Sequence, residues 1–279
     1  MIKVSICNIR SAEMKCEMKY AIMSDVHANP KALEVALADA RRLGCGKFIL
    51  LGDVTGYGYD PKGALEGVRR NFDVVLMGNH DSACTGLEPE WEVEMNNNYD
   101  LDRQARELLT EEERTWLRGL GYLHEEEGFV CAHGDFTQPK MWNYIFYGEA
   151  AERNFLARTE GLMFCGHTHV AAIWERTAKG VCRPKLERHF MRPAVRAESI
   201  SFRMNPTSRY IVNVGSVGYP RNDLCCSYGI YDAAARRVTV RRLPFDFKSY
   251  ITEMLDHKIQ LPVWLLRLLA AAQSASSRS

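Results

Sequence analysis

Five short clusters of aspartate, histidine and asparagine recur along the chain, each directly after an apolar run. The clusters are D-V-H at 25–27, G-D-V-T-G at 52–56, G-N-H-D at 78–81, H-G-D at 133–135 and G-H-T-H at 166–169. Carboxylate and amide oxygens together with imidazole nitrogens suit Mn, Fe or Zn rather than calcium. Glycines beside them allow sharp turns that bring side chains close to a small, highly charged ligand. The clusters therefore predict a transition-metal site.

Apolar runs that alternate with helical patterns predict the elements that would position these clusters. Strands are predicted at 20–23, 47–51, 73–77, 128–132 and 161–165, and helices at 30–43 and 61–71. Strand, helix and strand at this spacing indicate a parallel sheet with helices on its faces. Later strands at 210–214, 228–231 and 237–242, the last two joined as a hairpin, predict antiparallel pairing in the second half. Because ligands bind outside the carboxyl ends of such strands, all five clusters should converge there.

We expect one catalytic domain at residues 18–250, preceded by an extension at 1–17 and followed by a helical tail at 251–279. The charged segment from 88 to 120 is interpreted as a helical insertion in this domain. The basic segment 178–208 shows no pattern that assigns it an element. Apolar residues of the tail are expected to pack on the body rather than to form a dimer face, although the oligomeric state stays open. These residues are Leu261, Val263, Leu265, Leu266 and Leu269.

Composition excludes several classes of protein. The 279 residues carry 36 basic and 35 acidic side chains, and a net charge of +1 provides no overall field for a membrane surface or for a stable nucleic-acid partner. No apolar run reaches the length of a membrane span, and the first 23 residues lack the apolar core of a secretory signal. Nine cysteines without paired short spacings indicate reduced thiols. We therefore expect a cytoplasmic protein.

The five clusters, in this order, resemble the motifs of the calcineurin-like metallophosphoesterase family. These motifs are D-x-H, G-D-x-x-G, G-N-H-D, an isolated H-G and G-H-x-H, and each is intact here. Any one alone is a weak signal, whereas five in order are a strong one. The resemblance covers residues 18–245 and implies an α/β fold, a four-layer α-β-β-α sandwich of two mixed sheets flanked by helices.

The resemblance also implies a binuclear metal centre with two divalent ions, Mn or Fe in preference to Zn. Asp53 would bridge both ions, and a hydroxide held between them would attack phosphorus. His80 would then donate a proton to the leaving group as a general acid, oriented by Asp81. The remaining implied ligands are Asp25, His27 and His169 for one metal and Asn79, His133 and His167 for the other. For Asp135, a role in its loop and a role in catalysis stay open.

The segment 213–221, which reads N-V-G-S-V-G-Y-P-R, also resembles a family feature. Ser216 and the neighbouring glycines would bring backbone N–H groups near phosphate, and Arg221 would pair with it. The alternative is a tight turn with an arginine that faces solvent.

The chain departs from the serine/threonine phosphatases of the same superfamily at two points. It has G-D-V-T-G-Y-G where those enzymes carry an arginine shortly after the aspartate, and G-N-H-D where they carry G-N-H-E. It is more similar to the bacterial and archaeal phosphodiesterase-like branch, whose members are described as diadenosine tetraphosphatase-like. We therefore expect a nucleotide or polyphosphate diester as substrate. The alternatives are a phosphomonoesterase acting on phosphoproteins or small molecules and, more remotely, a non-catalytic scaffold that binds proteins.

Overall fold

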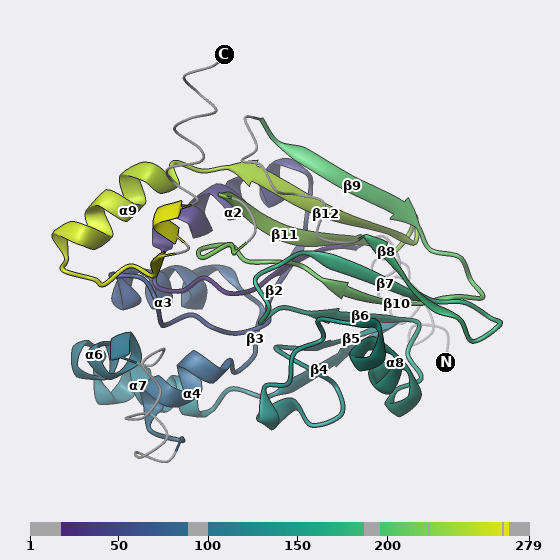
Figure 1. The fold of residues 1–279 in the computed structure, drawn as a ribbon, viewed down its shortest axis with the longest axis horizontal. Helices are drawn as coiled ribbons and strands as arrows, with labels where there is room; N and C mark the ends of the chain where they lie inside the picture. Colours follow the sequence, from purple (N-terminus) through teal and green to yellow (C-terminus); the bar gives the residue numbers. More distant parts are fainter. Residues whose placement is uncertain (1–17, 89–99, 187–195, 222–223, 264, 268–279) are drawn as a thin grey trace, which may run out of the picture.

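The computed structural model describes residues 18–88, 100–186, 196–221, 224–263 and 265–267. The predicted extension at 1–17 and Leu269 of the tail lie outside the described residues. Two six-stranded sheets and the helices around them make up the described chain (Figure 1).

In the first sheet, two neighbouring parallel strands are each followed in sequence by one of the clusters, 25–27 after β1 and 52–56 after β2. Its strands follow the order β3-β2-β1-β11-β12-β9. Pairing is parallel between β1, β2 and β3 and antiparallel from β1 to β11, β12 and β9. The strands are β1 (Lys19–Met23), β2 (Lys47–Leu50), β3 (Val74–Val75), β9 (Glu198–Arg203), β11 (Cys225–Asp232) and β12 (Arg237–Pro244). The predicted hairpin around 232–236 is confirmed by β11 and β12.

The second sheet is also mixed and has the order β4-β5-β6-β10-β7-β8. Its parallel part is β5, β6 and β10, while β4, β7 and β8 add antiparallel pairs. The strands are β4 (Leu123–Glu126), β5 (Phe129–Ala132), β6 (Leu162–Cys165), β7 (Ala172–Arg176), β8 (Cys182–Leu186) and β10 (Arg209–Asn213). The segment 178–208, which had no predicted element, thus contributes β8 and β9, one edge strand to each sheet.

Apolar side chains fill three spaces, which define four layers. Ile22, Phe164 and Val240 belong to the core between the two sheets. Helices α2 (Pro30–Arg42) and α3 (Pro61–Asn71) cover the outer face of the first sheet, and α8 (Gly148–Ala157) covers the second. The predicted sandwich of two mixed sheets flanked by helices is confirmed.

Local sequence explains where α2 begins and which face it buries. The side chain of Asn29 accepts a hydrogen bond from the Ala32 N–H at 3.0 Å, which satisfies one N–H of the first turn, and Pro30 fits the first helical position. Leu33 and Leu37 lie on the buried face because they are four residues apart. The loop that carries the first cluster is thereby held between β1 and a well-capped helix.

A group of short helices lies at one end of the sandwich (Figure 1). They are α4 (Asn79–Thr85) and the two helices that pack on it, α6 (Asp100–Leu108) and α7 (Glu111–Arg118). Helix α9 (Phe247–Asp256) lies at the same end, and a 3-10 turn, η2 (Pro139–Met141), is elsewhere. Of the predicted tail, Leu265 is buried and Leu261 is partly buried, while Val263 and Leu266 are exposed. Within the described residues, no helix combines the length and apolar character that crossing a bilayer requires.

The packing between the sheets leads to a stability prediction. Phe164 is fully buried and meets the Phe129 ring edge-on at 5.6 Å between centroids. Phe164→Ala removes most of that side chain, and we expect the free energy of unfolding to fall by about 3–5 kcal/mol. Urea denaturation measures the loss. Leu156→Ala on α8, where the side chain is 70% exposed, is the control and should change stability by less than about 0.5 kcal/mol. Equal losses in the two variants would contradict the assigned core.

Candidate metal centre

The five clusters meet where the parallel strands of both sheets end. Asp25 follows β1 and Asp53 follows β2, while His133 follows β5 and His167 follows β6. The G-N-H-D cluster follows β3 and forms the first turn of α4. The structure therefore brings both sheets' strand ends to one buried site, as the alternation of strands and helices predicted.

Several of these side chains are held by strained backbone. Outside glycine, ten described residues have a positive φ, and five of them belong to the clusters. Left-handed backbone is uncommon for residues other than glycine and costs on the order of 1–3 kcal/mol each, so it persists where the surroundings over-determine it. The five are Asp25, His27, Asp53, His167 and His169, with φ between 48° and 65°.

Glycines next to the clusters allow the side chains to approach the backbone. A Cβ on Gly78 would lie 2.1 Å from Asp53 Oδ1, and a Cβ on Gly166 would lie 2.6 Å from Asp25 Oδ2. Both distances are far below van der Waals contact. Any larger residue at these two positions would displace a carboxylate of the site.

The first group of potential ligands contains Asp25, His27, Asp53 and His169, all buried. His27 Nδ1 lies 2.9 Å from the Thr55 carbonyl oxygen and His169 Nδ1 lies 2.6 Å from the Tyr219 carbonyl oxygen. Since a carbonyl only accepts, both Nδ1 atoms carry the proton, and each Nε2 presents a lone pair. The Nε2 atoms of His27 and His169 are 3.0 Å apart, and Asp25 Oδ1 lies 3.3 Å from His169 Nε2. Lone pairs directed at one another in this way suit a shared cation.

The second group contains Asp53, His133 and His167. His133 Nε2 lies 3.1 Å from His167 Nδ1, 3.2 Å from Asn79 Oδ1 and 3.3 Å from Asp53 Oδ2. Nitrogen and oxygen ligands thus surround one point here as well. The predicted ligand Asn79 contributes an amide oxygen to this group.

Asp53 joins the two groups through a single oxygen. Its Oδ1 accepts a hydrogen bond from the His80 N–H at 3.0 Å, whereas Oδ2 lies 3.5 Å from His27 Nε2 and 3.3 Å from His133 Nε2. Asp53 Oδ2 and Asp25 Oδ1 are buried without a hydrogen-bond donor. A buried carboxylate oxygen without a donor is costly unless a cation compensates its charge, so these residues fit divalent metal ions.

Electrostatics within the site favour ionised carboxylates and largely neutral imidazoles. Burial raises the pKa of Asp25, but the imidazole of His169 outweighs it and holds that pKa well below its usual value. Burial lowers the pKa of His27 to about 4 and that of His167 to about 3. For His133 the effect of burial is reversed by the carboxylate of Asp53, which raises the pKa to about 9. Neutral imidazole is the form that binds metals, so His27 and His167 are already in that form and His133 would release its proton when a metal binds.

His80 is oriented by Asp102, so the predicted pairing with Asp81 is wrong. His80 Nδ1 lies 2.6 Å from Asp102 Oδ2, and both side chains are buried. Burial lowers the pKa of His80, but Asp102 and Asp53 outweigh burial and raise it above the usual value. Asp102 lies on α6, which is fixed to α4 by hydrogen bonds from Arg106 to the carbonyl oxygens of Ala83 and Cys84.

Asp81 instead holds the backbone that follows β2. Its carboxylate accepts hydrogen bonds from the N–H groups of Asp53 at 2.8 Å, Val54 at 2.9 Å and Thr55 at 3.1 Å. It also accepts one from Gly78 at 3.2 Å. These bonds fix the turn in which Asp53 adopts a positive φ, so Asp81 positions the shared carboxylate rather than the imidazole.

In the turn after β10, Ser216 has a structural role, whereas Arg221 lies beside the site. Ser216 is fully buried, and its hydroxyl donates to the Asp25 carbonyl at 2.9 Å and accepts from the Tyr219 N–H at 2.8 Å. The Ser216 N–H donates to Ser227 Oγ at 3.1 Å, so neither the N–H nor the hydroxyl of this residue is available to a phosphate, in contrast to the prediction. Arg221 is half-buried, and its Nη2 donates to the Tyr57 hydroxyl at 3.2 Å beside the site, so it is not the solvent-facing arginine of the alternative.

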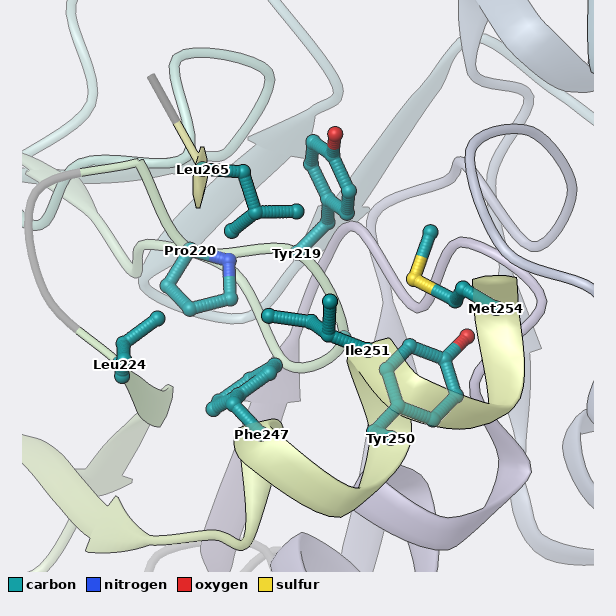
Figure 2. A pocket seen from close by; sticks show the side chains of 9 residues that line it. Tyr219, Pro220, Leu224, Phe247, Tyr250, Ile251, Met254 and Leu265 are labelled. Atoms are coloured by element: carbon teal, nitrogen blue, oxygen red, sulfur yellow. The ribbon is translucent and has the colours of Figure 1, made fainter. Parts of the chain in front are cut away.

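Helix α9 supports this turn from behind. Figure 2 shows Phe247 and Ile251 of α9 beside Pro220 and Leu265, in the apolar cluster that backs the turn. The space they enclose is about 10 Å³, which is too small for a ligand larger than one water molecule. The cluster is therefore a packing contact, and it holds the Tyr219 carbonyl that orients His169.

Comparison with known proteins places the chain in a family. Residues 18–236 match the calcineurin-like phosphoesterase superfamily domain, and the chain belongs to this superfamily. Membership supports a phosphoester hydrolase that uses divalent metal ions.

Several individual proteins are similar to the chain in sequence or in structure. The chain is similar to a metallophosphoesterase from Sphaerobacter thermophilus, with 32% identity, a TM-score of 0.73 and coverage of 91% of this chain and 98% of that one. It is also similar to an uncharacterized protein of Methanocaldococcus jannaschii, with 25% identity over 88% of this chain and 94% of the relative. A hypothetical protein from Pyrococcus horikoshii, 14% identical with a TM-score of 0.66 over 90% of this chain and 97% of that one, shares the fold.

Sequence reasoning missed Asp102 and the tyrosines around the site. Asp102 falls in a segment interpreted as a charged insertion, yet it lies three residues before Ala105 and seven before Leu109, all buried. An acidic residue on the apolar face of a helix is the signal that would have singled it out. Tyr57 lies 4.6 Å from His27 between ring centroids, and Tyr144 stacks on His167 at 4.2 Å. Nothing in their local sequence distinguishes these tyrosines from packing residues.

The shared position of Asp53 leads to a prediction about metal content. After loading with Mn²⁺ and dialysis, the protein should retain roughly two ions per chain, measured by inductively coupled plasma mass spectrometry. Asp25→Asn should reduce this to roughly one ion, because only the first group loses a charged ligand. Asp53→Asn should retain less than one ion per chain, because both ligand groups lose a charged ligand.

Asp135→Asn is the matched control for these variants. Asp135 is a buried carboxylate near the site, but it interacts with Thr137 and Gln138 of its own loop and belongs to neither ligand group. The Asp135→Asn variant should bind as many metal ions per chain as the unchanged protein. Undiminished metal in Asp53→Asn would contradict the shared ligand.

Proposed function

We propose that this protein is a binuclear metal-dependent phosphodiesterase. The observation that carries the proposal is the position of Asp53 Oδ2, which lies within 3.5 Å of an imidazole nitrogen from each ligand group. One metal site would be completed by Asp25, His27 and His169. The other would be completed by Asn79, His133 and His167. Bound divalent ions would lower the pKa of a shared water and offset charge on the phosphoryl oxygens.

The protein's own residues supply the remaining functions. His80 is placed to protonate the leaving-group oxygen, because Asp102 holds its Nδ1 and leaves Nε2 directed away from that bond. Arg221 presents a guanidinium at the edge of the site, where it can pair with a phosphoryl oxygen. Tyr57 and Tyr219, stacked at 4.4 Å, form an aromatic wall beside His27 that limits the entry of water.

Charge at the edge of the site favours a diester over a monoester. A diester carries one negative charge on the reacting phosphate, whereas a monoester carries up to two and needs more positive neighbours. The basic segment 178–208 is a second possible source of such charge. Two of its cations, Arg183 and Lys185, instead form ion pairs with Glu175. Arg221 is thus the guanidinium, among the described residues, that we assign to the reacting phosphate.

Mn²⁺ or Fe²⁺ are the metals we propose, in agreement with a mixed oxygen and imidazole ligand set. We further propose a cytoplasmic enzyme whose substrate is a nucleotide or polyphosphate diester. A solved structure assigned as a candidate diadenosine tetraphosphatase shares this fold at 14% identity and a TM-score of 0.50. That likeness motivates dinucleoside polyphosphates as compounds for a first substrate screen.

Hydrolysis of model esters tests the proposed activity. Metal-free protein reconstituted with Mn²⁺ should hydrolyse bis(p-nitrophenyl) phosphate with a higher kcat/KM than p-nitrophenyl phosphate. Asp53→Asn should lose most of this activity, and the control Asp135→Asn should retain it. A preference for the monoester would overturn the diesterase assignment in favour of a phosphatase. Folded protein that binds two metals but hydrolyses neither ester would favour a protein-binding scaffold.

Dependence on the leaving group tests the role of His80. A general acid matters most when the leaving oxygen is strongly basic, as in an alkyl ester, and least for p-nitrophenolate. His80→Ala should therefore lower kcat for an alkyl ester such as the dinucleotide thymidylyl-(3′→5′)-thymidine by about 10²- to 10⁴-fold, and less for bis(p-nitrophenyl) phosphate. Asp102→Asn should show the same selectivity with a smaller loss, whereas equal losses for both esters would contradict proton donation.

A further inference from the structure

A cavity of about 460 Å³ adjoins the second ligand group, because Tyr144 of its lining stacks on His167. It lies between the turn that carries Arg221 and the segment from 144 to 153, which includes the start of α8. Its volume is in the range of pockets that hold small organic ligands. The residues of its lining that matter here are Tyr144, Tyr147, Glu149, Arg153 and Arg221.

Two residues connect this cavity to the metal centre. The Tyr144 ring stacks on that of His167, with 4.2 Å between centroids and an angle of 11°. Arg221 interacts with Tyr144 on one side and with the hydroxyl of Tyr57 on the other. A group bound in the cavity would therefore lie close to a phosphate held at the metal centre, with Tyr144 and Arg221 at the boundary between the two.

The two ends of the site differ in their contacts. His80 lies 4.5 Å from Tyr57 between ring centroids, and Tyr57 lines a separate cleft of about 750 Å³ along α6. The leaving group, which receives the proton of His80, is thus assigned to that cleft. The cavity beside Tyr144 and His167 is left for the ester group that stays on phosphorus.

The chemistry of the cavity suits a planar aromatic group. Tyr147 is 67% exposed and Tyr144 is 49% exposed, so the cavity presents aromatic surface that a planar ligand can cover. Glu149 and Arg153 form no ion pair with one another or with any other described residue, so both remain able to bind polar edges of a ligand. Exposed rings beside guanidinium groups are the combination that stacks nucleobases and binds their phosphates.

We propose that this cavity binds the nucleoside retained on the reacting phosphate, and that Tyr147 and Arg153 determine specificity for it. The base would stack on the tyrosine rings, and Glu149 and Arg153 would contact its polar edge. The proposal rests on the phosphodiesterase activity proposed above, and it narrows the substrate to nucleoside 5′-phosphodiesters.

Two esters with the same leaving group test the proposal. Methyl p-nitrophenyl phosphate and thymidine 5′-(p-nitrophenyl phosphate) both release p-nitrophenolate, so a difference in kcat/KM reports the retained group. The unchanged enzyme should prefer the thymidine ester by about tenfold, mainly through a lower KM. Tyr147→Ala and Arg153→Ala should each reduce this preference several-fold, and both side chains are exposed, so folding should be unaffected.

Leu156→Ala on α8 is the matched control and should keep the full preference, because its exposed side chain is not part of the cavity. Equal kcat/KM values for the two esters in the unchanged enzyme, or a preference that survives in both cavity variants, would overturn the proposal while the phosphodiesterase assignment stands. Failure of the unchanged enzyme to hydrolyse either ester would overturn the phosphodiesterase assignment, and the assignment of the cavity to a retained nucleoside with it.

Discussion

Two buried carboxylate oxygens, Asp25 Oδ1 and Asp53 Oδ2, have no hydrogen-bond donor. The arrangement of the groups around them follows from the need to compensate this buried negative charge. Burying an ionised carboxylate costs several kcal/mol unless an opposite charge compensates it. The nearest groups are imidazole nitrogens, and those of His27 and His169 present lone pairs because their other nitrogens donate to carbonyl oxygens. Such a site is stable when cations occupy it, so metal binding and the stability of the folded chain should be coupled.

The rest of the fold meets the geometric demand of that site. Strand ends from two different sheets have to reach one point, and left-handed backbone at five potential ligands makes this possible. The strain is offset elsewhere: Asp81 fixes the turn at Asp53 through backbone N–H groups, and the apolar cluster under α9 fixes the turn at Tyr219. Asp81 and this apolar cluster are therefore required for the geometry of the metal centre even though neither needs to contact a substrate.

The sequence predicted the ligand clusters well because each is a local pattern at the end of a buried strand. Asp102 could not be predicted in this way, since its contact with His80 depends on how α6 docks against α4, which is tertiary packing. The strands β8 and β9 were missed for a different reason. Both lie at sheet edges, where polar side chains are tolerated, and β9 alternates between exposed and half-buried residues. Ser216 was misjudged because a turn serine in a glycine-rich segment serves packing as readily as phosphate binding.

In the proposed enzyme, the two clefts on either side of Tyr57 and Arg221 would hold the substrate from two sides of the metal centre. The central claim of this account is that one oxygen of Asp53 is shared by two ions. Anomalous diffraction from crystals of the Mn²⁺-loaded protein tests it most directly. The account predicts two peaks that flank Asp53 Oδ2, one beside His27 and His169 and the other beside His133 and His167. A single peak, or two peaks of which one lies away from Asp53, would contradict it.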